Sequence, residues 1–198
     1  MAPVKKSAKP SVKGPVILTP KGRSLFVSVP AASSYDPLKQ EASLLLTAED
    51  TAILKTQLQD FIDSPEVKAS GIADRDFVNA LFKADTDSDG NLTGLSRVKA
   101  KTAMQYPAKL YAANGDVFQP APGFTIPNRA DIKMSVRPEL METSMFTGIV
   151  LRLQAIKIFN LPSFDDGMSS DSDTSGSFSV PSAGSSYHVD TDETAGWE

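Results

Sequence analysis

Three cations recur at every second position in one stretch of this sequence. Arg97, Lys99 and Lys101 are separated by single apolar residues, so an extended strand would place all three on one face. They would then lie about 6.5–7 Å apart, which is close to the phosphate spacing of a nucleic-acid strand. The pattern predicts a phosphate-binding surface; for these residues alone, a solvated outer face is the equal alternative.

Aromatic residues and further cations surround this stretch. Tyr106 and Tyr111 follow it closely and would act as stacking platforms for unpaired bases, because every base presents an aromatic face. The alternative is that both tyrosines pack in a core. The cations that would widen the basic surface are Lys109, Arg129, Lys133 and Arg137. On these residues alone, a site for single-stranded nucleic acid and a solvated face with core tyrosines are equal alternatives; the acidic tail described below favours nucleic acid.

A second pattern indicates different chemistry. Asp85, Asp87 and Asp89 alternate before Gly90, as they do in a calcium loop of the EF-hand type. However, the twelfth loop position is Ser96, where a Glu normally completes the coordination, and the following residues alternate like a strand. An acidic hairpin turn is the favoured interpretation. A calcium-binding protein that uses residues 85–96 stands as an alternative function.

Charge divides the chain into two parts. Of its 20 basic and 24 acidic residues, all 20 basic and 16 acidic ones lie in residues 1–161, which are net +4, while residues 162–198 are net −8. An acidic tail competes with phosphate for a basic surface. The end of the tail would also bind partner proteins, and its candidate residues are Asp190, Asp192, Glu193, Trp197 and Glu198.

Composition argues against several classes of enzyme. The sequence contains no cysteine, and His188 in the acidic tail is the only histidine, so thiolate chemistry, a Ser-His-Asp triad and a multi-histidine metal site are excluded from residues 1–161. A nuclease using aspartate-bound metal is disfavoured, and we expect no enzyme and no cofactor. A chaperone-like or structural module is a further alternative. No apolar run reaches membrane-spanning length, so we expect a soluble, intracellular protein.

The elements that would position these residues are mostly strands. A capping box at Thr47–Asp50, followed by apolar residues at helical spacing, predicts a helix over 48–63, and a short helix is expected over 73–82. Alternation and turn residues predict strands over 16–18, 24–29, 38–46, 95–104, 109–112, 117–118, 131–137 and 148–161. This predicts a mainly β domain over 16–161, a small antiparallel barrel or sandwich with an inserted helix. A flexible basic arm (1–15) and a disordered acidic tail (162–198) would flank it.

The order of these parts resembles the single-stranded DNA-binding proteins encoded by bacteriophages. The resemblance covers about residues 15–161 plus the tail. Its pieces are Tyr35 before a strand and the 48–63 helix, the Asp-Gly hairpin before residues 97–101, the 109–115 segment with its Asn-Gly turn, the run 130–138 and the closing run 148–161.

The resemblance implies a five-stranded OB-fold barrel, binding of single-stranded DNA, and a role in phage replication, recombination and repair. It also implies that the tail recruits replication proteins such as a polymerase or helicase, with the protein a monomer or homodimer in the host cytoplasm. In such proteins an aromatic residue commonly ends the tail; here Trp197 is followed by Glu198.

Overall fold

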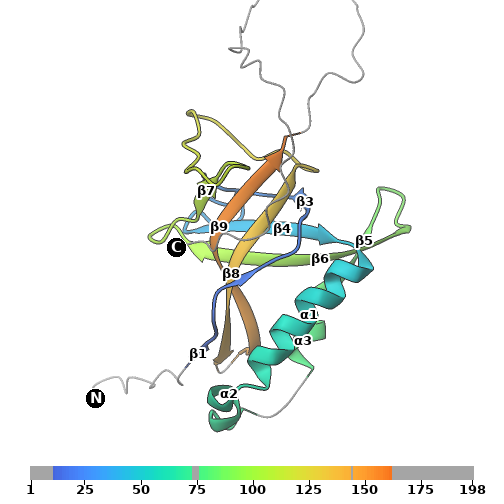
Figure 1. Cartoon of the computed structure of the whole chain (residues 1–198), viewed down its shortest axis with the longest axis vertical. Coiled ribbons are helices and arrows are strands. Elements are labelled where there is room, and N and C mark those ends of the chain that lie inside the picture. The colour runs from blue at the N-terminus through green and yellow to red at the C-terminus, as the bar shows by residue number, and fades with distance from the viewer. Residues whose placement is uncertain (1–10, 73–75, 144, 162–198) are drawn as a thin grey trace, which may run out of the picture. The chain divides into compact units, whose positions relative to one another are not determined.

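The computed structural model describes residues 11–72, 76–143 and 145–161. Long strands dominate this part of the chain (Figure 1). The helices are α1 (Ala48–Ile62), α2 (Pro65–Ala69) and α3 (Phe77–Ala80). The strands are β1 (Val12–Lys13), β2 (Ile17–Leu18), β3 (Gly22–Leu25), β4 (Lys39–Leu46), β5 (Phe82–Thr86), β6 (Leu92–Ala103), β7 (Lys109–Tyr111), β8 (Asp131–Glu142) and β9 (Thr147–Asn160).

Five of these strands form a closed ring. β3 pairs with β4, β4 with β6, β6 with β9, β9 with β8, and β8 with β3. Four of the pairings are antiparallel, and the ring closes through a parallel bridge between Lys101 of β6 and Arg152 of β9. A closed ring leaves its members without a free edge. The prediction of a mainly β, OB-like fold with an inserted helix is confirmed.

Alternation along the strands separates the core from the outer surface. On β6, Val98 and Ala100 are fully buried, while the basic residues between and beside them lie on the opposite face. On β8, Ile132, Met134 and Val136 are likewise fully buried. The period of two predicted for both segments is therefore confirmed, and it fixes which side chains are available to a ligand.

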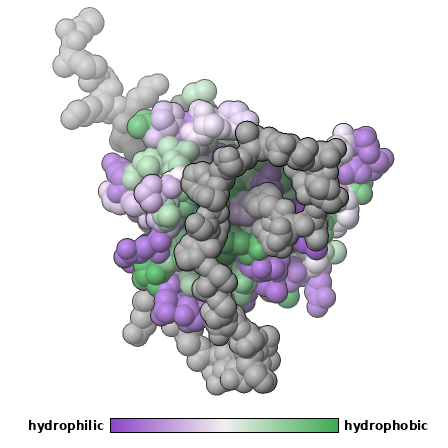
Figure 2. Space-filling view, turned by 90° about the horizontal axis from the view of Figure 1, so that it is seen from above, coloured by the Kyte–Doolittle hydropathy of each residue, from purple (hydrophilic) through white to green (hydrophobic). Residues whose placement is uncertain are grey.

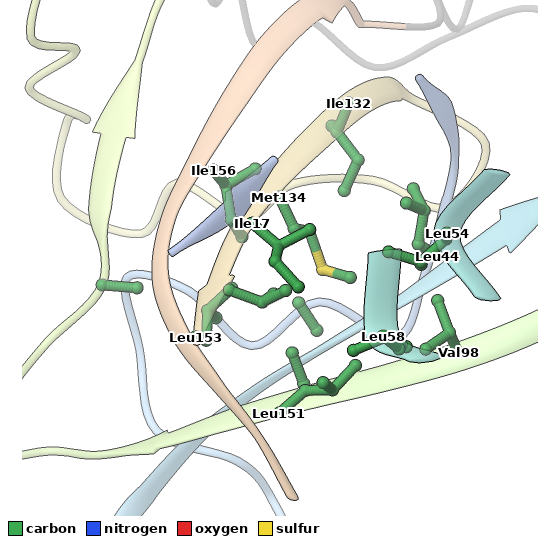
Figure 3. Packing of buried hydrophobic residues seen from close by; sticks show 14 of the residues in the cluster. Ile17, Leu44, Leu54, Leu58, Val98, Ile132, Met134, Leu151, Leu153 and Ile156 are labelled. Atoms are coloured by element: carbon green, nitrogen blue, oxygen red, sulfur yellow. The ribbon is translucent and has the colours of Figure 1, made fainter. Parts of the chain in front are cut away.

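Helix α1 packs its apolar side against the ring. Its first turn is held by Thr47, whose side chain accepts a hydrogen bond from the backbone N–H of Asp50, as the capping box predicts. Leu54 and Leu58 are fully buried, and Figure 3 shows them beside Leu44 of β4 and Val98 of β6 in the core. Burying each such leucine contributes about 1.5–3 kcal/mol.

Three predicted elements differ from the structure. The strand expected over 117–118 is only an isolated bridge between Val117 and Tyr111. The helix expected over 73–82 is only α3, because the chain is already in strand β5 at Phe82; residues 73–75 lie outside the described part. The strand expected over 24–29 ends at Leu25, because Phe26 has a left-handed backbone with φ of 52°. Val27 and Val29 are still buried, and Ser28 between them donates a 2.9 Å backbone hydrogen bond to Glu41 of β4.

The termini of the chain extend beyond the described residues. Within the arm expected to be flexible, Val12 and Lys13 form β1, which pairs with Leu140 and Glu139 of β8. Residues 1–10 and the predicted tail, 162–198, lie outside the described part. None of the described helices combines the length and the apolar composition that crossing a membrane requires.

Candidate nucleic-acid interface

A groove runs over the outer face of β4 and β6. It consists of two adjoining depressions that share Glu41, Leu81, Lys83 and Lys99 in their walls, and it is called the β4–β6 groove below. The strand register builds its floor, because Glu41 lies opposite Lys101 and Ser43 lies opposite Lys99. The alternating cations of β6 therefore face an open channel.

Three exposed aromatic side chains line the β4–β6 groove. Phe26 and Tyr35, in the connection between β3 and β4, are 66% and 94% exposed. Phe146, immediately before β9, is 48% exposed. Such exposure of large rings leaves apolar surface in water, which costs free energy unless a partner covers it. Exposed rings beside cations are the arrangement that stacks unpaired bases.

Local contacts hold these rings in place. The backbone N–H of Phe26 donates a 2.8 Å hydrogen bond to Oδ1 of Asn128, more than 100 residues away. The ring of Phe146 lies over Gly148, where an added Cβ would come within 3.0 Å of it. Tyr35 is positioned by a 3.3 Å hydrogen bond from its backbone N–H to the Ser33 hydroxyl.

The charge of the groove is mainly positive. Lys83, Arg97, Lys99 and Lys101 line it, together with the carboxylate of Glu41. Nζ of Lys99 lies 2.6 Å from Oε2 of Glu41, and the Glu41 side chain is mostly buried. This ion pair positions Lys99 and at the same time neutralises part of its charge. An incoming phosphate would therefore compete with Glu41 for Lys99.

A second carboxylate lies close to the aromatic end of the groove. The Lys39 side chain, by a hydrogen bond, and the backbone N–H of Leu38 hold the pKa of Asp36 below its usual range. Lys101 adds a weaker attraction. Asp36 is thus charged at neutral pH, and like Glu41 it limits the net positive charge of this face.

The nine basic and aromatic residues predicted to bind DNA do not all lie in this groove. Arg97, Lys99 and Lys101 do. Tyr106 and Arg137 share a different depression with Arg152. The other four lie on or next to the strands that follow β6: Lys109 and Tyr111 on β7, Arg129 just before β8, and Lys133 on β8.

Sequence reasoning missed Phe26, Lys83 and Phe146, and gave Tyr35 only as part of a resemblance. Phe26 and Tyr35 are distant in sequence from β6, and pairing between β3, β4 and β6 brings their loop to the groove. One signal was present in the sequence: Tyr35 stands among Ser33, Ser34, Asp36 and Pro37, a setting that offers an aromatic ring no core to pack in.

The segment proposed as a calcium loop is a β-hairpin turn. It connects β5 to β6, and Oδ1 of Asp87 accepts hydrogen bonds from the backbone N–H groups of Asp89 and Asn91. Hydrogen bonds from Asn91 also hold the pKa of Asp87 below its usual range. Within the described ranges, no group of three or more acidic or histidine side chains is placed to hold a metal ion. The hairpin interpretation is confirmed.

Hydrophobic and hydrophilic residues are interspersed on the end of the molecule seen in Figure 2, with purple hydrophilic residues toward the margin and green hydrophobic ones between them. The outer surface therefore offers apolar as well as charged contacts. The partner-binding residues predicted in the tail, Asp190, Asp192, Glu193, Trp197 and Glu198, lie outside the described residues.

Comparison with solved structures relates this fold to phage proteins. The single-stranded DNA-binding protein from bacteriophage Enc34 in complex with ssDNA matches with a TM-score of 0.59 and 13% identity, over 75% of this chain and 88% of that chain. Its C-terminal truncation gives 0.59 and 13%, over 75% and 87%. The single-stranded DNA-binding protein gp2.5 encoded by bacteriophage T7 gives 0.50 and 14%, over 79% and 91%.

Comparison of the amino-acid sequence with protein families and curated proteins gives no match. At 13–14% identity, the likeness to the phage proteins establishes the fold. The resemblance expected from the order of the sequence elements is confirmed at that level: the chain has the fold of phage-encoded single-stranded DNA-binding proteins.

Proposed function

We propose that this protein binds single-stranded DNA without sequence preference. The observation that carries the proposal is the β4–β6 groove, in which the exposed rings of Phe26 and Tyr35 share a wall with Arg97 and Lys99. Stacked rings and phosphate-binding cations together provide affinity for any base sequence. The fold shared with phage proteins that bind single-stranded DNA supports the same function.

The physical mechanism combines charge and stacking. The cations of β6 and Lys83 attract phosphates, which makes affinity fall as salt rises. Bases of an unpaired strand then stack on the exposed rings, with about 1–3 kcal/mol for each stacked base. A duplex gains little from the rings because its bases are already stacked and paired. The residues proposed to extend the DNA contact are Tyr106, Lys109, Tyr111, Arg129, Lys133 and Arg137.

We further propose a biological setting for this activity. The protein acts in phage DNA replication, recombination and repair in the host cytoplasm, as a monomer or homodimer and not as an enzyme. Its tail, net −8, competes with DNA for the basic surface and recruits replication proteins such as a polymerase or helicase. Asp190, Asp192, Glu193, Trp197 and Glu198 are the proposed contact residues.

Fluorescence-anisotropy titration tests the binding function and the tail together. Labelled single-stranded and duplex oligonucleotides are titrated with the intact protein and with a 1–161 truncation, at low and moderate salt. We expect preference for the single strand, tighter binding after truncation, and weaker binding with salt. Equal binding to duplex and single strand would contradict the stacking mechanism, and unchanged affinity after truncation would contradict the role of the tail.

A further inference from the structure

The outer face of β8 and β9 carries two pairs of like charges that lie directly opposite each other. Lys133 on β8 is the register partner of Lys157 on β9, and Arg137 is the partner of Arg152. Like charges at opposed positions destabilise an antiparallel pair, yet this arrangement occurs twice on the same two strands. An anion bound at each pair would relieve the repulsion within that pair.

We propose that these four residues, the β8–β9 basic face, form a second phosphate-contact surface. It rests on the proposed function, because the phosphates are those of the same single-stranded DNA that occupies the β4–β6 groove. The DNA path would leave the groove and continue over β9 and β8. The protein would therefore contact a longer stretch of DNA than the groove alone can hold.

The first pair is held in a defined arrangement by one aromatic ring. Nζ of Lys133 lies 5.9 Å from the ring centroid of Phe159, and Nζ of Lys157 lies 5.4 Å from it. The negative face of the ring attracts both ammonium groups. Two ammonium groups gathered at one ring present a concentrated positive charge, to which a phosphate can bind as a shared counter-ion.

The two arginines of the second pair differ in their hydrogen bonding within the protein. Nε of Arg152 donates a 2.6 Å hydrogen bond to Oε2 of Glu139. Nε of Arg137 is buried and has no hydrogen-bond partner among the described residues. The two arginines line a depression together with Lys13 and Tyr106, and Tyr106 is 72% exposed. Cations and an exposed ring therefore recur here, as in the groove.

The two surfaces are joined through the strand order. The bridge between Lys101 and Arg152 closes the ring. Lys101 of the groove is therefore the direct neighbour of Arg152 of the β8–β9 basic face. Crossing from β6 to β8 spans two strand spacings, about 10 Å, and Lys133 lies about 13 Å along β8 from Arg137. A single strand can cover these distances with a few nucleotides.

Two acidic residues of β8 lie next to cations, and one of these cations, Arg152, belongs to the β8–β9 basic face itself. Glu139 is bound to Arg152, and Asp131 is the register partner of Arg23 on β3. Asp131 and Glu139 therefore reduce the positive charge at the two ends of the surface. Lys133 and Arg137 lie between these two acids on β8.

The test is a double variant, Lys133→Gln/Arg137→Gln, in the intact chain. It removes one cation from each like-charge pair and leaves the Arg152–Glu139 ion pair in place. Binding to oligonucleotides of about 6 and about 30 nucleotides, chosen to fill one OB-type site or to extend beyond it, is measured by anisotropy between 50 and 200 mM salt. A thermal melt accompanies each titration.

The salt slope is the slope of the logarithm of the binding constant against the logarithm of the salt concentration. On the long strand we expect the magnitude of this slope to be about 1.4 smaller for the variant, since each lost single-strand phosphate contact removes about 0.7. The affinity ratio of wild type to variant should then change about sevenfold between the two salt concentrations. Binding of the short strand stays as in the wild type. The melting temperature does not fall, because like-charge repulsion has been removed.

The matched control is Lys55→Gln/Lys68→Gln, which removes two lysines from α1 and α2. Lys55 also lies over an aromatic ring, 5.3 Å from the centroid of Phe82, so the control removes the same charge and the same kind of contact elsewhere. Its slopes should equal those of the wild type. If the double variant melts earlier than the wild type, Lys133→Gln alone replaces it, with an expected slope loss of about 0.7.

Three results would overturn the proposal, and they differ from one another. Unchanged slopes on the long strand would show that the β8–β9 basic face does not contact DNA, while the groove function stands. An equal loss on short and long strands would assign both cations to the groove site itself. Failure of the wild type to bind either strand would remove the proposed function together with this extension of it.

Discussion

The exposed rings of Phe26 and Tyr35 give the strongest prediction, because their removal should affect binding without affecting the fold. The two side chains are 66% and 94% exposed, so their truncation removes little buried surface and should leave the melting temperature nearly unchanged. If each ring stacks on one base, Phe26→Ala and Tyr35→Ala should each lose about 1–3 kcal/mol, or about 5- to 150-fold in affinity for single-stranded DNA.

The assay is anisotropy with a labelled single strand at fixed salt, combined with a thermal melt. Ile53→Ala on α1 is the control, because Ile53 is a large apolar residue, 48% exposed, that is not part of the groove wall. The stacking contribution is independent of phosphate contacts, so the salt slope of each ring variant should match that of the wild type. Wild-type affinity in the Phe26→Ala/Tyr35→Ala double variant would refute the stacking argument.

Phe26 allows a second check, because its backbone conformation is unfavourable for a residue with a Cβ. Its φ of 52° lies in the left-handed region, which costs such a residue roughly 1–2 kcal/mol and glycine far less. Phe26→Gly should therefore bind DNA as weakly as Phe26→Ala and melt at the same temperature as the wild type or higher. A lower melting temperature together with weaker binding would indicate that the ring supports the fold instead.

Three further predictions concern charge and core. Glu41→Gln frees Lys99 from its 2.6 Å ion pair and should tighten single-strand binding about threefold with a steeper salt slope; weaker binding would mean that Glu41 is needed to position Lys99. Burial alone would raise the pKa of Glu139, but hydrogen bonds from Arg152 and Ser11 hold it below its usual range. The stabilisation from Glu139 is thus present above the unfolded-state pKa and lost as pH falls through the lower folded-state pKa. Melts between pH about 5 and 2 should show a smaller loss in Glu139→Gln, and an identical loss would contradict this. Leu58→Ala, at a fully buried position, should lower the free energy of unfolding by about 2–5 kcal/mol in urea titrations; a change below about 1 kcal/mol would contradict its place in the core.

The elements that could be predicted from the sequence are those with a strong local signal. The helix predicted over 48–63 from its capping residues and apolar period is α1, and the strands predicted over 95–104 and 131–137 from alternation lie in β6 and β8. Short helices carried weaker signals. Helix α2 was not predicted; Ser64 caps it and Pro65 begins it, because proline suits the first position of a helix.

The binding site was only partly predictable, because strand pairing creates it. Alternation identified Arg97, Lys99 and Lys101 as one face, and this holds in the structure. The register that places Glu41 beside them, and the loop that brings Phe26 to the groove, depend on contacts between distant segments. Local patterns do not encode such contacts, and they likewise do not show that Tyr106 lies in a different depression from Arg97.

The central claim is that single-stranded DNA occupies the β4–β6 groove, and a backbone amide NMR titration tests it most directly. An unlabelled oligonucleotide of about ten nucleotides, within the range covered by one OB-type domain, is added to isotope-labelled intact protein. The largest shifts are expected at Phe26, Tyr35 and residues 97–101, with residues of the exposed side of α1, such as Ile53, unchanged. Shifts centred on α1, or no shifts at saturating DNA, would contradict the claim.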